Sequence, residues 1–260
     1  FNNVLTHSMS AFPFYKYQGT GNDFIMIDGR KVERAWRPHE IARLCHRRFG
    51  IGADGLIILH PHPHLDFKMQ YFNADGAEST MCGNGGRCVA RFAADRGLGP
   101  GPFHFEAVDG PHQAYLKENG AVALSMQPVS ALQKSGADLL LNTGSPHFIR
   151  FAEAIEQEDM VALGRKIRYA PSFQEEGINV NLVEPGPDGL QVRTYERGVE
   201  DETYSCGTGV TAAALAAHTR LGYQSPVSIR TPGGQLKVYF EKTGQAYTSI
   251  FLEGPATFVF

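Results

Sequence analysis

Short runs of alternating apolar and polar residues, separated by turn residues, extend along most of the chain. Apolar residues at every second position predict strands with one buried face. In the first half, the runs that predict strands are 24–28, 55–59, 66–72, 103–107, 113–117 and 122–126. In the second half they are 147–151, 178–183, 190–196, 227–231, 235–240 and 248–253, followed by a last short strand within 256–260.

Three segments have helical spacing instead. One helix is expected after Cys82, continuing to about Gly97, and an alanine-rich one after Cys206, continuing to about Leu221. A shorter pattern, PHEIARLC, ends at Cys45. Many short strands with few helices predict an α+β fold, with mixed strands around a helix in each half.

The chain contains an internal repeat of low identity. TGNDF at 20–24 corresponds to TGSPHF at 143–148, and NADG at 73–76 corresponds to YERG at 195–198. Cys206 follows Cys82 by 124 positions, and each cysteine precedes Gly-x-Gly. Three motifs in one order at nearly one spacing indicate a duplicated unit. We therefore expect two pseudo-symmetric halves with an active-site cleft between them.

Loop composition suggests where the halves divide. We expect an N-terminal half at 14–127 and a C-terminal half at 128–255, and the strand at 256–260 could return to the first half. Residues 1–13 lack the alternation, so Met9 could be a native start preceded by a short added segment.

Composition and charge narrow the classes of function. The 260 residues are 42% hydrophobic and 20% charged, which is typical of a globular protein. A net charge of -3 without blocks of like charge predicts neither nucleic acid nor a membrane as partner. We expect a cytoplasmic protein that acts on a small molecule; a homodimer is one option.

The four cysteines form no CxxC pair and no zinc-like spacing. Cys45 and Cys88 lie in helical patterns and are expected in the core, whereas Cys82 and Cys206 precede glycine-rich helix starts. Backbone N–H groups and the helix dipole at such a start bind anions and lower the pKa of a nearby thiol. Each of the two loops could therefore hold a carboxylate beside a thiolate base.

If the halves face one another, the two cysteines lie on opposite faces of one bound carbon. One thiolate can then remove an α-proton while the other thiol returns a proton from the opposite face, which is the chemistry of a racemase or epimerase. A turnover of about ten per second allows a barrier of roughly 16 kcal/mol, so thiols alone are insufficient. Because the sequence has no convincing lysine-centred pyridoxal phosphate site, we expect no cofactor and no metal, with the helix starts stabilising the anion instead.

The motifs GTGNDF, FNADG, MCGNGGRC, GSPH, GINVNLV and YERG followed by SCGTG resemble the cofactor-independent diaminopimelate epimerases, from Lys16 through nearly the whole chain. The resemblance implies epimerisation of LL- to meso-diaminopimelate, a step in lysine and cell-wall precursor biosynthesis, with Cys82 and Cys206 as the acid/base pair. It implies substrate contacts from Asn22, Asn73, Ser145, Asn179, Glu196 and Arg197, and carboxylate-binding loops at Gly83, Asn84, Gly207 and Thr208. It also makes His147, together with Glu196, a modulator of the thiol pKa values.

The chain departs from the family pattern at two positions. Ser145 stands where the family often has Asn, and it can still form a hydrogen bond. Gly55 stands where the family often has Gln, so one polar contact must come from elsewhere or is absent.

Several alternatives fit the sequence less well. Another two-cysteine amino-acid racemase would share all these features. A cysteine hydrolase with Cys206 as nucleophile leaves the loop at Cys82 unexplained, and a dinucleotide site lacks the preceding apolar strand. HPHPH at 60–64 could bind a metal, although its prolines suggest an exposed loop. A binding module without catalysis would use the same cleft.

Overall fold

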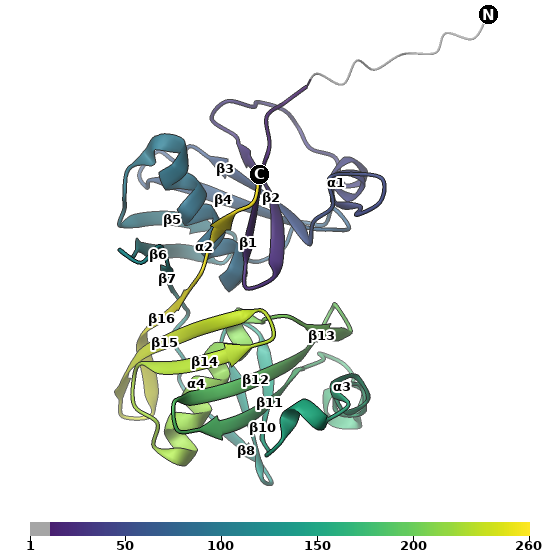
Figure 1. Ribbon diagram of the computed structural model, residues 1–260, viewed down its shortest axis with the longest axis vertical. Helices are drawn as coiled ribbons and strands as arrows, with labels where there is room; N and C mark the ends of the chain where they lie inside the picture. The colour runs from purple at the N-terminus through teal and green to yellow at the C-terminus, as the bar shows by residue number, and fades with distance from the viewer. Residues whose placement is uncertain (1–10) are drawn as a thin grey trace, which may run out of the picture.

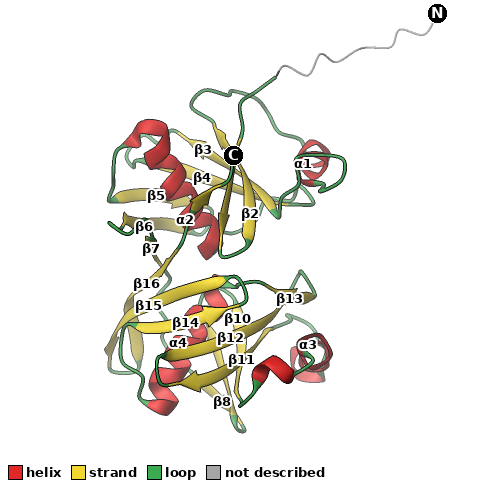
Figure 2. Ribbon diagram, in the orientation of Figure 1, coloured by secondary structure: helices red, strands yellow, loops and turns green. Residues whose placement is uncertain are grey.

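The computed structural model describes residues 11–260, and its strands form two halves placed end to end (Figures 1 and 2). Met9 lies outside the described residues. The first half contains β1 (Tyr15–Gly19), β2 (Asn22–Asp28), α1 (Pro38–Cys45), β3 (Gly55–His60), β4 (Phe67–Asn73), α2 (Gly83–Ala93), a π-helical turn (Ala94–Leu98), β5 (Phe103–Ala107), β6 (Gly110–Leu116) and β7 (Val122–Ser125).

The second half follows the same order with a few additions. It contains β8 (Gln133–Ser135), β9 (Asp138–Asn142), β10 (Pro146–Phe151), a 3₁₀ turn (Ile155–Gln157), α3 (Met160–Arg168), a second 3₁₀ turn (Pro171–Phe173), β11 (Asn179–Gly186), β12 (Gly189–Glu196), β13 (Asp201–Thr203), α4 (Gly207–Leu221), β14 (Val227–Thr231), β15 (Gly234–Thr243), β16 (Ala246–Gly254) and β17 (Thr257–Phe258).

Strand pairing repeats from one half to the other. β1 to β4 pair as antiparallel, parallel and antiparallel neighbours, and β9 to β12 pair in the same way. β4–β5 and β12–β14 are both parallel, and each is followed by two antiparallel pairs. The register agrees as well, since Phe24 lies opposite Gly55 and Phe148 lies opposite Val180. The expected α+β fold of two pseudo-symmetric halves is confirmed.

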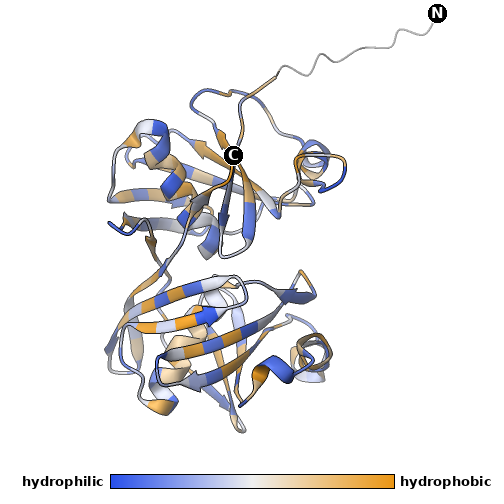
Figure 3. Ribbon diagram, in the orientation of Figure 1, coloured by the Kyte–Doolittle hydropathy of each residue, from blue (hydrophilic) through white to orange (hydrophobic). Residues whose placement is uncertain are grey.

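Each half encloses one helix. α2 contacts strands β1 to β4, β6, β7 and β17, while α4 contacts β9 to β12 and β14 to β16. Ten of the fifteen residues of α4 are buried, from Gly207 to Ala217, which explains its run of alanines: a helix surrounded on all sides needs small side chains to let the strands approach. The strands show alternating hydrophobic and hydrophilic bands, as the sequence predicted (Figure 3).

Two strands connect the halves. β16 pairs with β15 of the second half and with β7 of the first. The chain then returns to the first half, where β17 pairs with β1. The boundaries expected near 127 and 255 stay a prediction, while the last strand lies beside the first half.

Candidate active site

The starts of α2 and α4 touch each other between the two halves. A Cβ atom added to Gly207 would lie 3.1 Å from the Cα of Gly83, and one added to Gly83 would lie 3.4 Å from the Cα of Gly207. Glycine at both positions is therefore what allows the two helices to meet end to end. Cys82 and Cys206 are the N-cap residues of these helices, so both thiols belong to one small region.

Cys82 lies among amide groups of the first half. Its Sγ accepts a hydrogen bond from the backbone N–H of Gly85 at 3.1 Å and lies 3.9 Å from Oδ1 of Asn22. Asn84 crosses to the other half, where its Nδ2 donates to the backbone carbonyl of Ser205 at 3.0 Å. This contact fixes the Cys82 helix start against the segment that carries Cys206.

Cys206 ends a chain of hydrogen bonds in the second half. Asn181 Nδ2 donates to Nδ1 of the fully buried His147 at 3.1 Å, so Nε2 carries the ring proton and donates to Oγ1 of Thr208 at 2.9 Å. Thr208 Oγ1 lies 3.4 Å from the Sγ of Cys206. Burial lowers the pKa of His147 to about 3, which keeps the ring neutral.

Burial dominates the acidity of both thiols. It raises the pKa of Cys82 to about 11 and that of Cys206 to about 12. Backbone and side-chain donors at the helix starts act in the opposite direction but do not outweigh burial. The donors at the helix starts thus lower the thiol pKa, in the direction expected from the sequence, but the net shift is upward because burial opposes the charged form more strongly than the donors favour it.

Glu196 and Asn22 connect further charged groups to this region. Burial raises the pKa of Glu196, whose Oε2 accepts from Thr203 Oγ1 at 2.8 Å, and its negative charge raises the pKa of both thiols. Asn22 Nδ2 donates to Oδ2 of Asp54 at 2.7 Å.

Arg197, Asn179 and Ser145 form a second cluster. Asn179 Oδ1 accepts from the backbone N–H of Arg197 at 2.9 Å, and its Nδ2 donates to Ser145 Oγ at 2.8 Å. The exposed Arg197 guanidinium donates to the carbonyl of Glu176 at 2.8 Å and to Ser145 Oγ at 3.4 Å. This cluster presents a cation and neutral hydrogen-bonding groups, a combination that suits a carboxylate.

The site residues predicted from the sequence do not all lie in one place. Asn73 ends β4 opposite Gly55, and within residues 11–260 its side chain makes no hydrogen bond. Gly83, Asn84, Gly207 and Thr208 are all at the two helix starts. Sequence reasoning missed Asn181, although a polar residue within the buried run of β11 was a signal, and it also missed Arg87.

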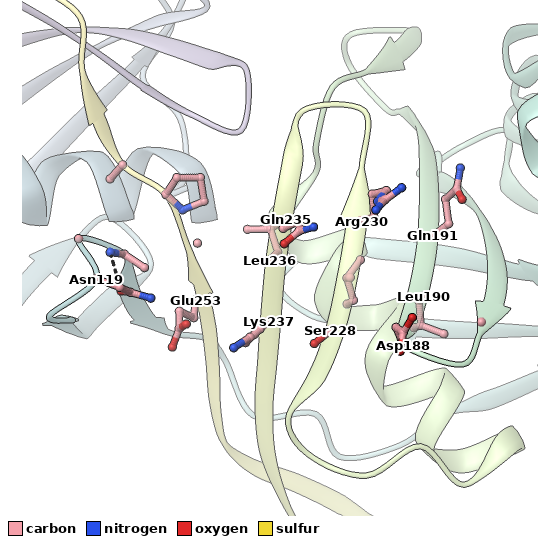
Figure 4. A pocket seen from close by; sticks show the side chains of 18 of the residues that line it. Asn119, Asp188, Leu190, Gln191, Ser228, Arg230, Gln235, Leu236, Lys237 and Glu253 are labelled. Atoms are coloured by element: carbon pink, nitrogen blue, oxygen red, sulfur yellow. Dashed lines mark hydrogen bonds between the residues drawn. The ribbon is translucent and has the colours of Figure 1, made fainter.

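A groove of about 1,100 Å³ lies elsewhere between the halves (Figure 4). Its lining includes Arg230, Lys237, Asp188 and Glu253, and neither cysteine contributes to it. Figure 4 shows Arg230 and Lys237 on strands of the second half, Asp188 in the turn between β11 and β12, and Glu253 on the connecting strand β16. The groove is thus separate from the region of the thiols.

Two histidines of the HPHPH segment each lie beside a partner other than histidine. His60 lies 3.0 Å from Gln70, and His62 lies 2.7 Å from Glu106. Across residues 11–260, no three His, Cys, Asp or Glu side chains are grouped so as to hold a metal ion. In the same part of the chain, no helix has the length and apolar character to cross a membrane.

Comparison with known proteins shows to which family the chain is related. The family model for diaminopimelate epimerase matches residues 14–132 and 139–259. The chain belongs to the diaminopimelate epimerase family. Relatives named diaminopimelate epimerase include one from Flavobacterium psychrophilum, 47% identical over 95% of this chain and 97% of its own length, and one from Aquifex aeolicus, 40% identical over 86% and 88%. The chain is therefore an isomerase of the epimerase class.

Solved structures extend the fold beyond this family. A phenazine biosynthesis protein of the PhzF family from Bacillus anthracis aligns with a TM-score of 0.72 at 16% identity, over 95% of this chain and 96% of its own. A hydroxyproline epimerase from Agrobacterium vitis aligns with a TM-score of 0.65 at 15% identity, over 95% and 90%. At these identities the likeness shows a common fold alone.

Proposed function

We propose that this protein converts LL-diaminopimelate to meso-diaminopimelate without a cofactor, using Cys82 and Cys206 as a two-base pair. Family membership supports the substrate. The observation that carries the mechanism is the contact between Gly83 and Gly207, because it brings two helix starts, each capped by a cysteine, to one place. A carbon held there can be approached by a thiol from each face.

The reaction moves one proton off the α-carbon and another onto it. One cysteine, as thiolate, removes the α-proton from one face, and the electron pair moves into the α-carboxylate. The other cysteine, as thiol, donates its proton to the opposite face, so the pair ends with the charge on the second sulfur. The bound carboxylate becomes dianionic in between, and the N–H groups at both helix starts stabilise it where it forms.

The far end of the substrate is assigned to the second cluster. Arg197 grips the distal carboxylate with two parallel hydrogen bonds, while Asn179 and Ser145 orient it. Glu196 accepts from an ammonium group. A bound ammonium also offsets the negative charge that otherwise raises the pKa of both thiols. A free amino acid as substrate fits a cytoplasmic enzyme, and we expect no nucleic acid or membrane partner.

Proton exchange in deuterated water tests this function. Dialysed, chelator-treated protein should convert LL-diaminopimelate to meso-diaminopimelate and place deuterium at one α-carbon, which NMR and mass spectrometry detect. Proline and other monoamino acids should not exchange at comparable rates, since they lack the distal groups. Exchange that requires added pyridoxal phosphate, or binding without exchange, would overturn the proposal.

A further inference from the structure

Arg87 is a buried cation without an acidic partner. Its side chain is 0% exposed, and it is among the largest fully buried side chains of residues 11–260. Its hydrogen-bond acceptors are all uncharged: the carbonyls of Gly83 (3.0 Å) and Pro255 (3.4 Å), Oδ1 of Asn84 (2.9 Å) and Oγ1 of Thr20 (3.4 Å). No salt bridge within the described residues includes it. Burial of a charge without a counter-charge is costly, so its retention calls for a reason.

The guanidinium lies directly beneath the meeting point of the two helices. A Cβ atom on Gly83 would lie 3.9 Å from Nη1 of Arg87 and 3.4 Å from the Cα of Gly207. Backbone closes around the group from other sides, since Cβ atoms on Gly19 and Gly254 would come within 3.3 Å and 3.2 Å of its nitrogens. Burial lowers the pKa of Arg87 to about 10, so the group is charged at neutral pH.

The second half has no such charge. Thr211 follows Arg87 by the same 124 positions that separate the two cysteines. Its Oγ1 donates to the carbonyl of Gly207 at 2.9 Å, just as Arg87 Nη1 donates to the carbonyl of Gly83. The duplicated position thus keeps its contact with the helix start but carries a cation only beside Cys82.

The surroundings of the two thiols differ accordingly. Arg87 lowers the pKa of Cys82, whereas the groups that lower the pKa of Cys206 most are the Thr208 hydroxyl and the backbone N–H of Gly209. Glu196 raises the pKa of both and is the largest contributor after burial for Cys206. The ionisable groups around the pair are Arg87 and Cys88 from α2, Tyr71 from β4, Glu196 from β12, the neutral His147 from β10, which reaches Cys206 through Thr208, and, further away, Asp54 before β3.

We propose that Arg87 is a positioning residue that makes Cys82 the first of the two thiols to lose its proton, so that the single thiolate of the pair forms on Cys82 while Cys206 keeps its proton. The inference rests on the proposed two-base function for its meaning, but not for its test. Arg87 has no acidic hydrogen-bond partner among the described residues, and its bond to the Gly83 carbonyl places the cation next to the residue that follows Cys82. Its charge therefore acts on the thiols of α2, Cys88 and Cys82, and Cys82 is the one at the helix start that would hold the substrate carboxylate. The symmetric pair is thereby given one preferred protonation state.

Thiol alkylation measures this preference without turnover. The full chain, free of substrate, is treated with iodoacetamide across a pH series, and each cysteine is followed by fragment-ion mass spectrometry. The pH midpoint of Cys82 should lie below that of Cys206. In Arg87→Met, the Cys82 midpoint should rise by about one unit, a roughly tenfold slower alkylation at fixed pH, while Arg87→Lys restores most of it.

Arg91→Met is the matched control. Arg91 lies one turn further along α2 and forms a salt bridge with Asp95. The Arg91→Met change removes the same charge from the same helix and should leave both alkylation midpoints unchanged. A Cys82 midpoint equal to or above that of Cys206 in the wild type would overturn the proposal, even if Arg87→Met does not fold. So would an unchanged midpoint in folded Arg87→Met. Ordered midpoints in a protein without α-proton exchange would instead reject the proposed function and leave the role of Arg87 standing.

Discussion

The helix starts at Cys82 and Cys206 have the same backbone and different neighbours. Each cysteine is an N-cap, and each helix begins with a glycine that contacts the other. At Cys82 the neighbours are amides and a buried cation, while at Cys206 they are a hydroxyl and the neutral ring of His147. The two halves thus share one backbone frame at the helix starts, while the neighbouring side chains make the surroundings of the two thiols chemically distinct.

The turns before α2 and α4 also share a backbone feature and differ in their side chains. Gly76 and Gly198 have nearly equal positive φ angles, 89° and 91°, so both turns need glycine at the equivalent position. In the second half the turn carries Glu196 and Arg197, whereas in the first half Asp75 only accepts a hydrogen bond from Ala77 at 2.8 Å. This difference agrees with the proposed binding of the distal end of the substrate by the second half alone.

The largest expected effect tests whether the two thiols are equally necessary. Cys82→Ala and Cys206→Ala should each reduce epimerisation by about a thousandfold or more, because inversion needs an acid or base on both faces. Cys88→Ala is the control: this thiol is fully buried in α2, so its loss should lower the melting temperature and leave kcat within about twofold. The turnover of each variant, measured by the appearance of the meso product, distinguishes these outcomes. Near-normal activity of either single variant would mean that the cysteine at that helix start has no part in catalysis.

A smaller effect is expected where the turns differ. Arg197→Lys should raise KM for diaminopimelate by roughly ten- to a hundredfold, because Lys cannot form two parallel hydrogen bonds with a carboxylate. Asp75→Asn, the matched change in the first half, should leave KM and kcat unchanged. Initial rates over a range of substrate concentrations separate the outcomes, and equal effects of the two changes would mean that the distal end binds elsewhere.

His147 and Asp23 occupy equivalent positions before Phe148 and Phe24, and we expect both contributions to stability to be lost as the pH falls, in different pH ranges. His147 has a folded pKa near 3, below its unfolded value, so its contribution to stability is complete above about pH 6.5 and is lost as the pH falls. Although burial raises the pKa of Asp23, hydrogen bonds from Arg47 and Lys16 lower it overall, so its contribution persists to lower pH. His147→Gln should reduce kcat about tenfold and remove a loss of about 2 kcal/mol between pH 6.5 and pH 5 in denaturant unfolding. A wild-type stability that is flat across that range would contradict the neutral buried ring.

Much of this comparison was readable from the sequence. Alternation located the strands, and the repeat located both cysteine loops. The sequence did not give β1, β9 or α3, because β1 and β9 are short runs at the edge of each pattern and α3 covers only one side of the second half. Arg87 was missed because its position in GGRC reads as an ordinary charged residue of a helix, and what buries it is the packing of β1 and of the segment after β16 against α2.

The smallest expected effect concerns Ser145, where the chain departs from the family pattern. Ser145 Oγ accepts from Asn179 and Arg197, but Asn179 Nδ2 also donates to the carbonyl of Pro146 at 3.0 Å, and Arg197 keeps its bond to Glu176. Ser145→Ala should therefore raise KM only about two- to fivefold, since each partner retains another contact. Ser145→Asn should bind at least as well as the wild type, because its longer side chain can donate to the substrate directly. A loss in the Asn variant as large as that of Arg197→Lys would mean that the hydroxyl itself fixes the guanidinium, and that the second half allows less variation at its distal contacts than its hydrogen bonds indicate.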